Sequence, residues 1–436
     1  LSSFLFLKGR QKMTKTKKKN RKDSKGKVLR TGESERSNGT YMYRYVPKIR
    51  GRSVNSPEKK DNRITIYAKT LPELRQKELQ ITQDIIEEID TVNGNKTVAS
   101  MTKLYIDLKK NLHFTTRESY LSVYRCHIKD SWFGEMCIKD VTKTDVILFY
   151  NEITEDLTNS FLENVHRIIH GCFDLALENH WIRFNPTQNV MRLYPANVPE
   201  RQPYTKEQEN LLLNFVKNDG TYYIYYPLII CFLETMLRAS EMFGLTWSNI
   251  DFINNTITVD HQVLYTRYEG KYQFIASKVK TKAGNRVIPL TQRAKKAFLY
   301  QRKQQISLNR QPTIQVGSYS DFVFTTRSGR PYTVPNVDKY FSRLIKAYNR
   351  KEAALAKKEG RDPISLPHLT CHVLRHTGCS NFCKLFYKER LDIKILQKWM
   401  GHASIEITME IYNHATEADQ EDALKAIEQA RQKLCL

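Results

Sequence analysis

The sequence of 436 residues lacks the usual marks of secreted, zinc-binding and membrane-spanning proteins. Its eight cysteines stand singly with no CxxC pair, so neither a zinc framework nor a disulfide ladder is predicted, and reduced thiols are expected. The longest apolar run, residues 222–233, contains a proline and is too short to cross a bilayer. The opening LSSFLFL has no basic segment before it and no small-residue cleavage site after it, which is not typical of a secretion signal.

Acidic residues are also in short supply. There are 46 Asp and Glu against 70 Lys and Arg, which leaves a formal charge of +24. Such an excess favours a polyanionic partner, although ribosomal and membrane-surface proteins share it. Residues 1–40 hold 13 basic and 3 acidic residues. Because apolar residues are rare after Leu7, residues 1–39 are predicted to form a basic disordered tail, which either solubilises the chain or contacts phosphates.

Length and periodicity predict a multidomain chain, mainly α with small β-sheets. Residues 40–92 are expected to fold as a three-stranded sheet backed by one helix, with strands over 40–46, 48–54 and 63–68 and the helix over 71–88. Residues 97–193 are expected to form a helical bundle, with helices near 98–111, 116–129, 143–154 and 158–180. By themselves, these patterns report burial and not a function.

Prolines at 195, 199 and 203 indicate a linker to the last domain, residues 204–416. Thr205 and Gln208 predict a capping box, and residues 256–290 predict a small antiparallel sheet within this mixed, mainly helical domain. Residues 417–436 predict a final helix with a single apolar stripe. That helix is expected to dock either on its own domain or on a neighbouring copy.

Two arginines in the last domain are candidate phosphate ligands. Arg238 follows the buried run in LRASEMFGL, where an unpaired charge is costly. Its expected partner is either Glu241 alone, three residues on, or a phosphate that Arg238 holds while Glu241 orients the guanidinium. Arg375 and His372 stand three apart in HVLRH, on a helix that Thr370 is expected to cap. His376 raises the alternative of a metal pair, but position 373 is valine and supplies no carboxylate base.

Further candidates are a lysine, a second histidine and a tyrosine. Lys278, Lys280 and Lys282 fall on one face of a hairpin strand whose turn is expected near residues 283–285, and spacing alone does not choose among them. His402 and Tyr412 lie ten residues apart in MGHASIEITMEIYNH. A tyrosine near the end of a domain is commonly structural. Two guanidiniums, an ammonium, imidazoles and a phenol are together what a metal-free attack on a phosphodiester needs.

In the order of these residues and in the sequence motifs around them, the chain resembles the tyrosine recombinase family, most closely the integrases of conjugative transposons. The resemblance extends over the chain beyond about residue 40. It implies Tyr412 as nucleophile, Arg238 and Arg375 as a phosphate clamp, His372 and His402 as assistants, and Lys280 as the family's lysine, since KTK precedes the R-x-I-P-L-like strand at Arg286. The family usually has glycine where this chain has Met236.

The resemblance further implies an arm-site DNA-binding domain over 40–92, a core-binding domain over 97–193 and a catalytic domain over 204–416. The expected activity is site-specific cleavage and rejoining of double-stranded DNA at element ends and target sites, through a 3′-phosphotyrosine and a Holliday junction. A homotetramer on DNA, excisionase and DNA-bending accessory proteins, and a place at the nucleoid in a bacterial cytoplasm are expected, with no cofactor, metal or membrane. The alternatives are a type IB topoisomerase and a non-catalytic DNA-binding regulator.

Overall fold

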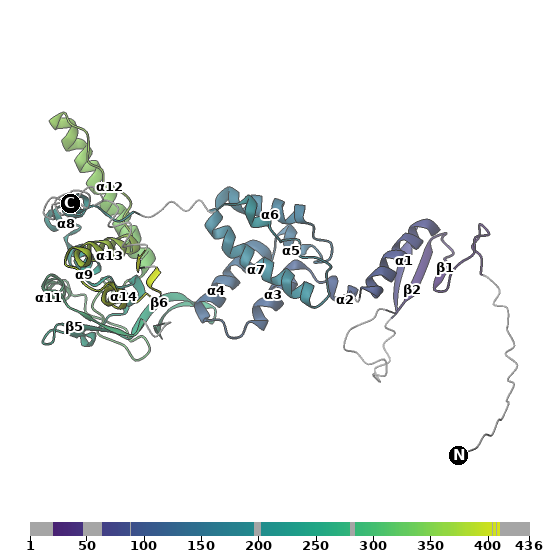
Figure 1. Ribbon diagram of the computed structural model, residues 1–436, viewed down its shortest axis with the longest axis horizontal. Coiled ribbons are helices and arrows are strands. Elements are labelled where there is room, and N and C mark those ends of the chain that lie inside the picture. The colour runs from purple at the N-terminus through teal and green to yellow at the C-terminus, as the bar shows by residue number, and fades with distance from the viewer. Residues whose placement is uncertain are drawn as a thin grey trace, which may run out of the picture. The chain divides into compact units, whose positions relative to one another are not determined.

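The computed structural model describes residues 21–46, 63–87, 89–195, 202–279, 284–402, 404–406 and 408–409. The chain divides into two compact units, residues 1–198 and 199–436 (Figure 1). Among the residues described, no helix combines the length and the apolar character needed to cross a bilayer.

The first unit begins with a small sheet backed by a helix (Figure 1). Its strands pair antiparallel in the order β1-β2-β3, with bounds Glu33–Glu35, Tyr41–Tyr45 and Ile64–Ala68. The helix α1, Leu71–Ile86, is capped by Thr70 and packs Leu71 and Leu74 against Tyr41 and Ala68. Two of the predicted strands and the helix are therefore confirmed. The remaining predicted strand, residues 48–54, lies outside the described residues.

The expectation that all of residues 1–39 form a disordered tail is wrong for the described part, since β1 lies there. Besides Leu29, which packs against the core that contains Tyr41 and Leu74, polar contacts hold this segment. The Glu33 carboxylate is fully buried and accepts from Arg75 Nε at 3.0 Å, and the Tyr41 hydroxyl donates to Asp23 at 2.8 Å. A prediction based on apolar content could not detect a segment fixed in this way.

The rest of the first unit is a helical bundle, as predicted. Its main helices are α3 Val98–Leu108, α4 Phe114–Val123, α6 Lys143–Asp156 and α7 Asn159–Glu178. Short elements join them: α2 Thr91–Gly94, a π-helical turn Tyr124–Ile128, α5 Trp132–Glu135 and a 3-10 turn Val190–Leu193. One core, which includes Phe133, Phe149 and Phe173, holds the bundle together.

The second unit is built around the buried helix α9, Tyr226–Thr235, which corresponds to the predicted apolar run. The predicted capping box of Thr205 and Gln208 opens α8, Lys206–Asn218. The other helices are α10 Ala239–Gly244, α11 Gln292–Ser307, α12 Val334–Glu359, α13 Cys371–Lys388 and α14 Ile393–Met400, with 3-10 turns at Tyr223–Tyr225 and Trp247–Asn249. The C-terminal end of α12 projects away from the other helices of this unit (Figure 1).

Two small antiparallel sheets complete the second unit. One has the order β4-β5-β8, with bounds Ile250–Asp251, Thr256–Val259 and Arg286–Pro289; the other pairs β6 His261–Tyr268 with β7 Lys271–Lys278. The predicted hairpin with a turn near residues 283–285 is wrong, because β7 pairs with β6, and β8 returns to β5. Local alternation identified the strands, but the partner of β8 lies about 30 residues earlier.

Candidate active site

Four of the six predicted site residues lie in the described part of the chain. Arg238 stands at the start of α10, His372 and Arg375 lie on α13, and His402 follows α14. Lys280 and Tyr412 lie outside the described residues. The structure brings Arg238, Arg375 and His402 together at the C-terminal end of α14.

Three successive carbonyls at that end each accept a hydrogen bond from a different arginine. Arg286 Nε donates to Trp399 at 2.8 Å, Arg375 Nη2 donates to Met400 at 2.7 Å, and Arg238 Nη2 donates to Gly401 at 2.8 Å. The last carbonyls of a helix lack intrahelical partners and carry partial negative charge, so they suit cationic donors. The end of α14 therefore fixes the positions of three guanidiniums.

Arg286 was not predicted as a site residue, although its pairing is the most enclosed in the cluster. It forms two hydrogen bonds with the Glu241 carboxylate, at 3.1 and 3.0 Å, and the two side chains are only 1% and 2% exposed. A sequence signal did exist. Arg286 alternates with the buried residues Ile288 and Leu290, so strand periodicity places a charge where it needs a buried partner.

Glu241 also contacts Arg238, as predicted for an orienting partner. Its Oε1 accepts from Arg238 Nη1 at 3.0 Å, and its Oε2 accepts from the Arg238 backbone N–H at 2.8 Å. Burial alone would raise the pKa of Glu241, but the hydrogen bonds and charges of Arg286 and Arg238 outweigh it and hold that pKa below its ordinary value. The carboxylate is therefore ionised at neutral pH.

Arg375 is buried and spans two helix ends. Besides the Met400 carbonyl, its guanidinium donates to the carbonyl of Met236, the residue that ends α9. Met236 has a left-handed backbone with φ of 54°, a conformation that favours glycine. The glycine usual in the family thus has a backbone reason, while the methionine side chain fills a core with Cys379, Phe386 and Met400.

His402 connects this cluster to the segment that leads toward Tyr412. Its Nε2 accepts from Arg375 Nη2 at 3.1 Å, so its Nδ1 carries the proton and donates to the buried Thr408 hydroxyl at 3.0 Å. Burial, with the charges of three arginines, lowers the pKa of His402 to about 3. The imidazole is therefore neutral at pH 7.

His372 differs from Arg375 in its surroundings, although both lie on the helix that Thr370 caps as predicted. Its ring is exposed and stacks on His376, with 6.5 Å between the ring centroids. In the described ranges, no set of three or more His, Cys, Asp or Glu side chains is arranged to hold a metal ion. The alternative of a metal pair at these histidines thus lacks a third ligand there.

The charges of the cluster fit a phosphate. Three guanidiniums and one carboxylate leave a net charge of +2 beside a neutral imidazole. A phosphodiester carries one negative charge and gains a second as a nucleophile adds to phosphorus. Arg238 is 42% exposed, whereas Arg286 is covered, so Arg238 is the accessible side of the pair that Glu241 joins.

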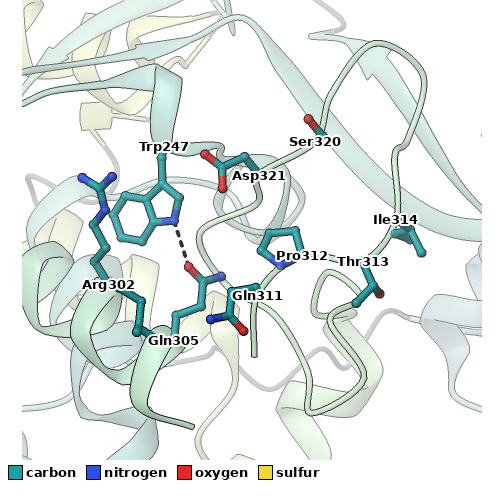
Figure 2. A pocket seen from close by; sticks show the side chains of 10 residues that line it. Trp247, Arg302, Gln305, Gln311, Pro312, Thr313, Ile314, Ser320 and Asp321 are labelled. Atoms are coloured by element: carbon teal, nitrogen blue, oxygen red, sulfur yellow. Dashed lines mark hydrogen bonds between the residues drawn. The ribbon is translucent and has the colours of Figure 1, made fainter. Parts of the chain in front are cut away.

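A separate hollow of about 550 Å³ contains none of the predicted site residues (Figure 2). There the Trp247 indole donates to Gln305 at 2.9 Å, and the Arg302 guanidinium lies 5.5 Å from the indole ring. Gln305 also donates to the Phe322 carbonyl at 2.8 Å, so its amide joins α11 to the segment that contains Phe322. These contacts give Trp247, Arg302 and Gln305 a structural role in the fold.

Comparisons with known proteins point in one direction. A model described as the phage integrase family matches residues 203–419, and a model of the DNA-binding domain of Tn916 integrase matches residues 17–85. The transposase from transposon Tn916 of Enterococcus faecalis is 30% identical over 412 residues, which cover 91% of this chain and 94% of that protein. The ICEBs1 integrase of Bacillus subtilis is 23% identical over 354 residues, 80% of this chain and 87% of its own.

Solved structures agree with these relatives. A fragment of the Tn1549 transposon integrase, in complex with transposon right end DNA, matches with a TM-score of 0.62 and 27% identity. The match covers 75% of this chain and 99% of that fragment. The same integrase with circular intermediate DNA gives a TM-score of 0.63 at 26% identity.

Proposed function

Because this chain belongs to the phage integrase family, as a site-specific recombinase of the tyrosine type, we propose that its arginine cluster holds a scissile DNA phosphate while Tyr412 attacks it. One observation supports this most strongly. Three arginines are fixed on successive carbonyls at the end of α14, and His402 beside them binds Thr408, which stands four residues before Tyr412 in the sequence. The recombinase acts on the DNA of a mobile element, and the type IB topoisomerase alternative receives no support from the relatives.

In the proposed reaction, the Tyr412 oxygen forms a bond to phosphorus and the bond to the 5′ oxygen breaks. Arg238 and Arg375 bind the non-bridging oxygens, and Lys280 gives a proton to the departing 5′ oxygen. His372 assists removal of the proton from the Tyr412 hydroxyl, and neutral His402 holds Arg375. The 3′-phosphotyrosine retains the energy of the broken bond, so a 5′ hydroxyl from a second duplex can attack it and rejoin the DNA without ATP.

The assembly follows from the same proposal. Double-stranded DNA is the partner, and we expect a homotetramer on paired sites that passes through a Holliday junction. Residues 40–92 would contact arm sites, residues 97–193 would clamp the core site, and residues 204–416 would cut it. Residues 417–436 would dock on a neighbouring copy, with excisionase and DNA-bending proteins as accessories and the bacterial nucleoid as location.

A nicked suicide substrate that carries the element end tests the chemistry, because loss of the short 5′ fragment traps the covalent intermediate. We expect a protein-DNA adduct on a denaturing gel for the wild type, with or without EDTA, and none for Tyr412→Phe. Tyr387→Phe, at an exposed tyrosine on α13, is the matched control and should form the adduct. An adduct in Tyr412→Phe would assign the nucleophile elsewhere.

Two further variants test the clamp and the domains. Arg238→Lys should lose at least about 100-fold in cleavage rate with little change in binding, since one ammonium cannot replace a guanidinium fork. Removal of residues 1–92 should weaken binding to arm-site DNA and spare cleavage of core-site DNA. A near-normal rate in the first case, or equal losses in the second, would contradict the assignments.

A further inference from the structure

Arg286 has the geometry of a structural arginine and the contacts of a site residue. Its side chain is 1% exposed, so it cannot reach DNA in this conformation. Its bonds nevertheless end on three parts of the site: Glu241 beneath Arg238, the Trp399 carbonyl of α14, and the Gly284 carbonyl at 3.0 Å. Gly284 stands four residues after Lys280 in the sequence.

Glu241 is shared between two arginines with different exposure. Each carboxylate oxygen accepts one bond from Arg286 and one from Arg238, at distances between 2.8 and 3.1 Å. If Arg286 were absent, the whole negative charge would act on Arg238. The Arg238 guanidinium would then be drawn toward Glu241, and its charge would be neutralised just where a phosphate is expected.

From these contacts we infer that Arg286 is a positioning residue. By sharing the negative charge and the hydrogen bonds of Glu241, it keeps the Arg238 guanidinium oriented toward the scissile phosphate with its positive charge available. Arg286 itself does not touch the DNA. This inference rests on the proposed function and adds a residue that acts only through another one.

A double-variant cycle on the cleavage rate tests the inference, because a positioning residue has an effect only while its target is present. The rate is measured at saturating enzyme on the nicked suicide substrate, for the wild type and for Arg286→Met, Arg238→Lys and the double variant. We expect Arg286→Met to lower the rate about 100-fold in the wild type and less than about 3-fold in the Arg238→Lys background. DNA affinity should stay within about 3-fold throughout.

Two controls separate positioning from folding. Arg293→Met removes another arginine of the same unit, which pairs with Glu234 at 3.0 Å and with Glu209 at 3.5 Å, two carboxylates outside the cluster, and it should keep the wild-type rate. Glu241→Gln should reproduce part of the rate loss, because an amide cannot hold both guanidiniums. If Arg286→Met does not fold, Arg286→Lys is used in the same cycle, since it keeps the charge but not the fork.

Each outcome decides the question. Equal rate losses from Arg286→Met in both backgrounds would mean that the residue acts on the fold and not through Arg238, which overturns the inference. A loss of less than 3-fold in the wild-type background would overturn it as well. Failure of the wild type to form any adduct would instead refute the proposed function, so the two failures are distinguishable.

Discussion

Gly401→Ala is a sharp test of the arrangement at the end of α14. Gly401 has φ of 67°, and a Cβ added there would lie 2.8 Å from Arg286 Nη1 and 2.9 Å from its Cζ. The guanidinium is the far end of a flexible side chain, but it cannot move freely because it is enclosed and bonded to Glu241, Trp399 and Gly284.

The magnitude follows from two separable costs. The left-handed backbone should cost alanine about 1–2 kcal/mol. Displacement of Arg286 should weaken a buried ion pair, and the full loss of such a pair costs about 3–5 kcal/mol. We therefore expect Gly401→Ala to lower the free energy of unfolding by at least about 2 kcal/mol more than backbone strain alone, and to lower the cleavage rate at least about 10-fold through Arg238.

Gly360→Ala is the matched control, because this glycine ends α12 with φ of 66° and an added Cβ would meet nothing within 4 Å. Urea unfolding gives the stability of both variants, and the suicide substrate gives their rates. The control should lose only the stability that backbone strain costs, about 1–2 kcal/mol, and should keep the wild-type cleavage rate. Equal stability losses in the two variants, with both rates unchanged, would refute the role assigned to the contact between residues 401 and 286.

Three other predictions concern the same cluster. Met236→Gly should relieve about 1–2 kcal/mol of backbone strain but lose about 2–5 kcal/mol of buried packing, so urea unfolding should show a net loss despite the glycine usual in the family; a gain would contradict this account. Thr408→Val should lower the cleavage rate about 10-fold by removing the hydroxyl that accepts from His402, whereas Thr408→Ser should retain the rate, and equal rates in the two variants would exclude this role. The pKa of His402 is about 3 in the folded chain and near 6.5 when unfolded, so the unfolded chain binds more protons between these values. Stability should therefore fall as the pH drops from about 6.5 toward 3, and His402→Gln should flatten that slope in urea unfolding measured at several pH values; an unchanged slope would count against a neutral, buried imidazole.

Local patterns predicted much of this structure. The cap at Thr370, the capping box at Thr205 and the four long helices of the first unit depend on residues that are close in sequence, and the structure confirms them. Likewise, a buried run before Arg238 correctly indicated a charge that needs a partner, and Glu241 meets it.

Features that depend on distant partners were not predicted. The order β4-β5-β8, the pairing of Arg286 with Glu241 and the three carbonyls of α14 all join segments that are far apart in sequence. Periodicity reports that a position is buried but not what it contacts. Strand β1 was missed for a related reason, because Glu33 and Arg75 hold it by an ion pair across 42 residues.

The most direct test of the central proposal is to identify the residue that carries the DNA. Trapped adduct is digested with nuclease and trypsin, and the modified peptide is sequenced by mass spectrometry. We predict a nucleotide attached through its 3′ phosphate to the peptide of residues 399–425, whose single tyrosine is Tyr412. A nucleotide attached to any other residue would contradict the account.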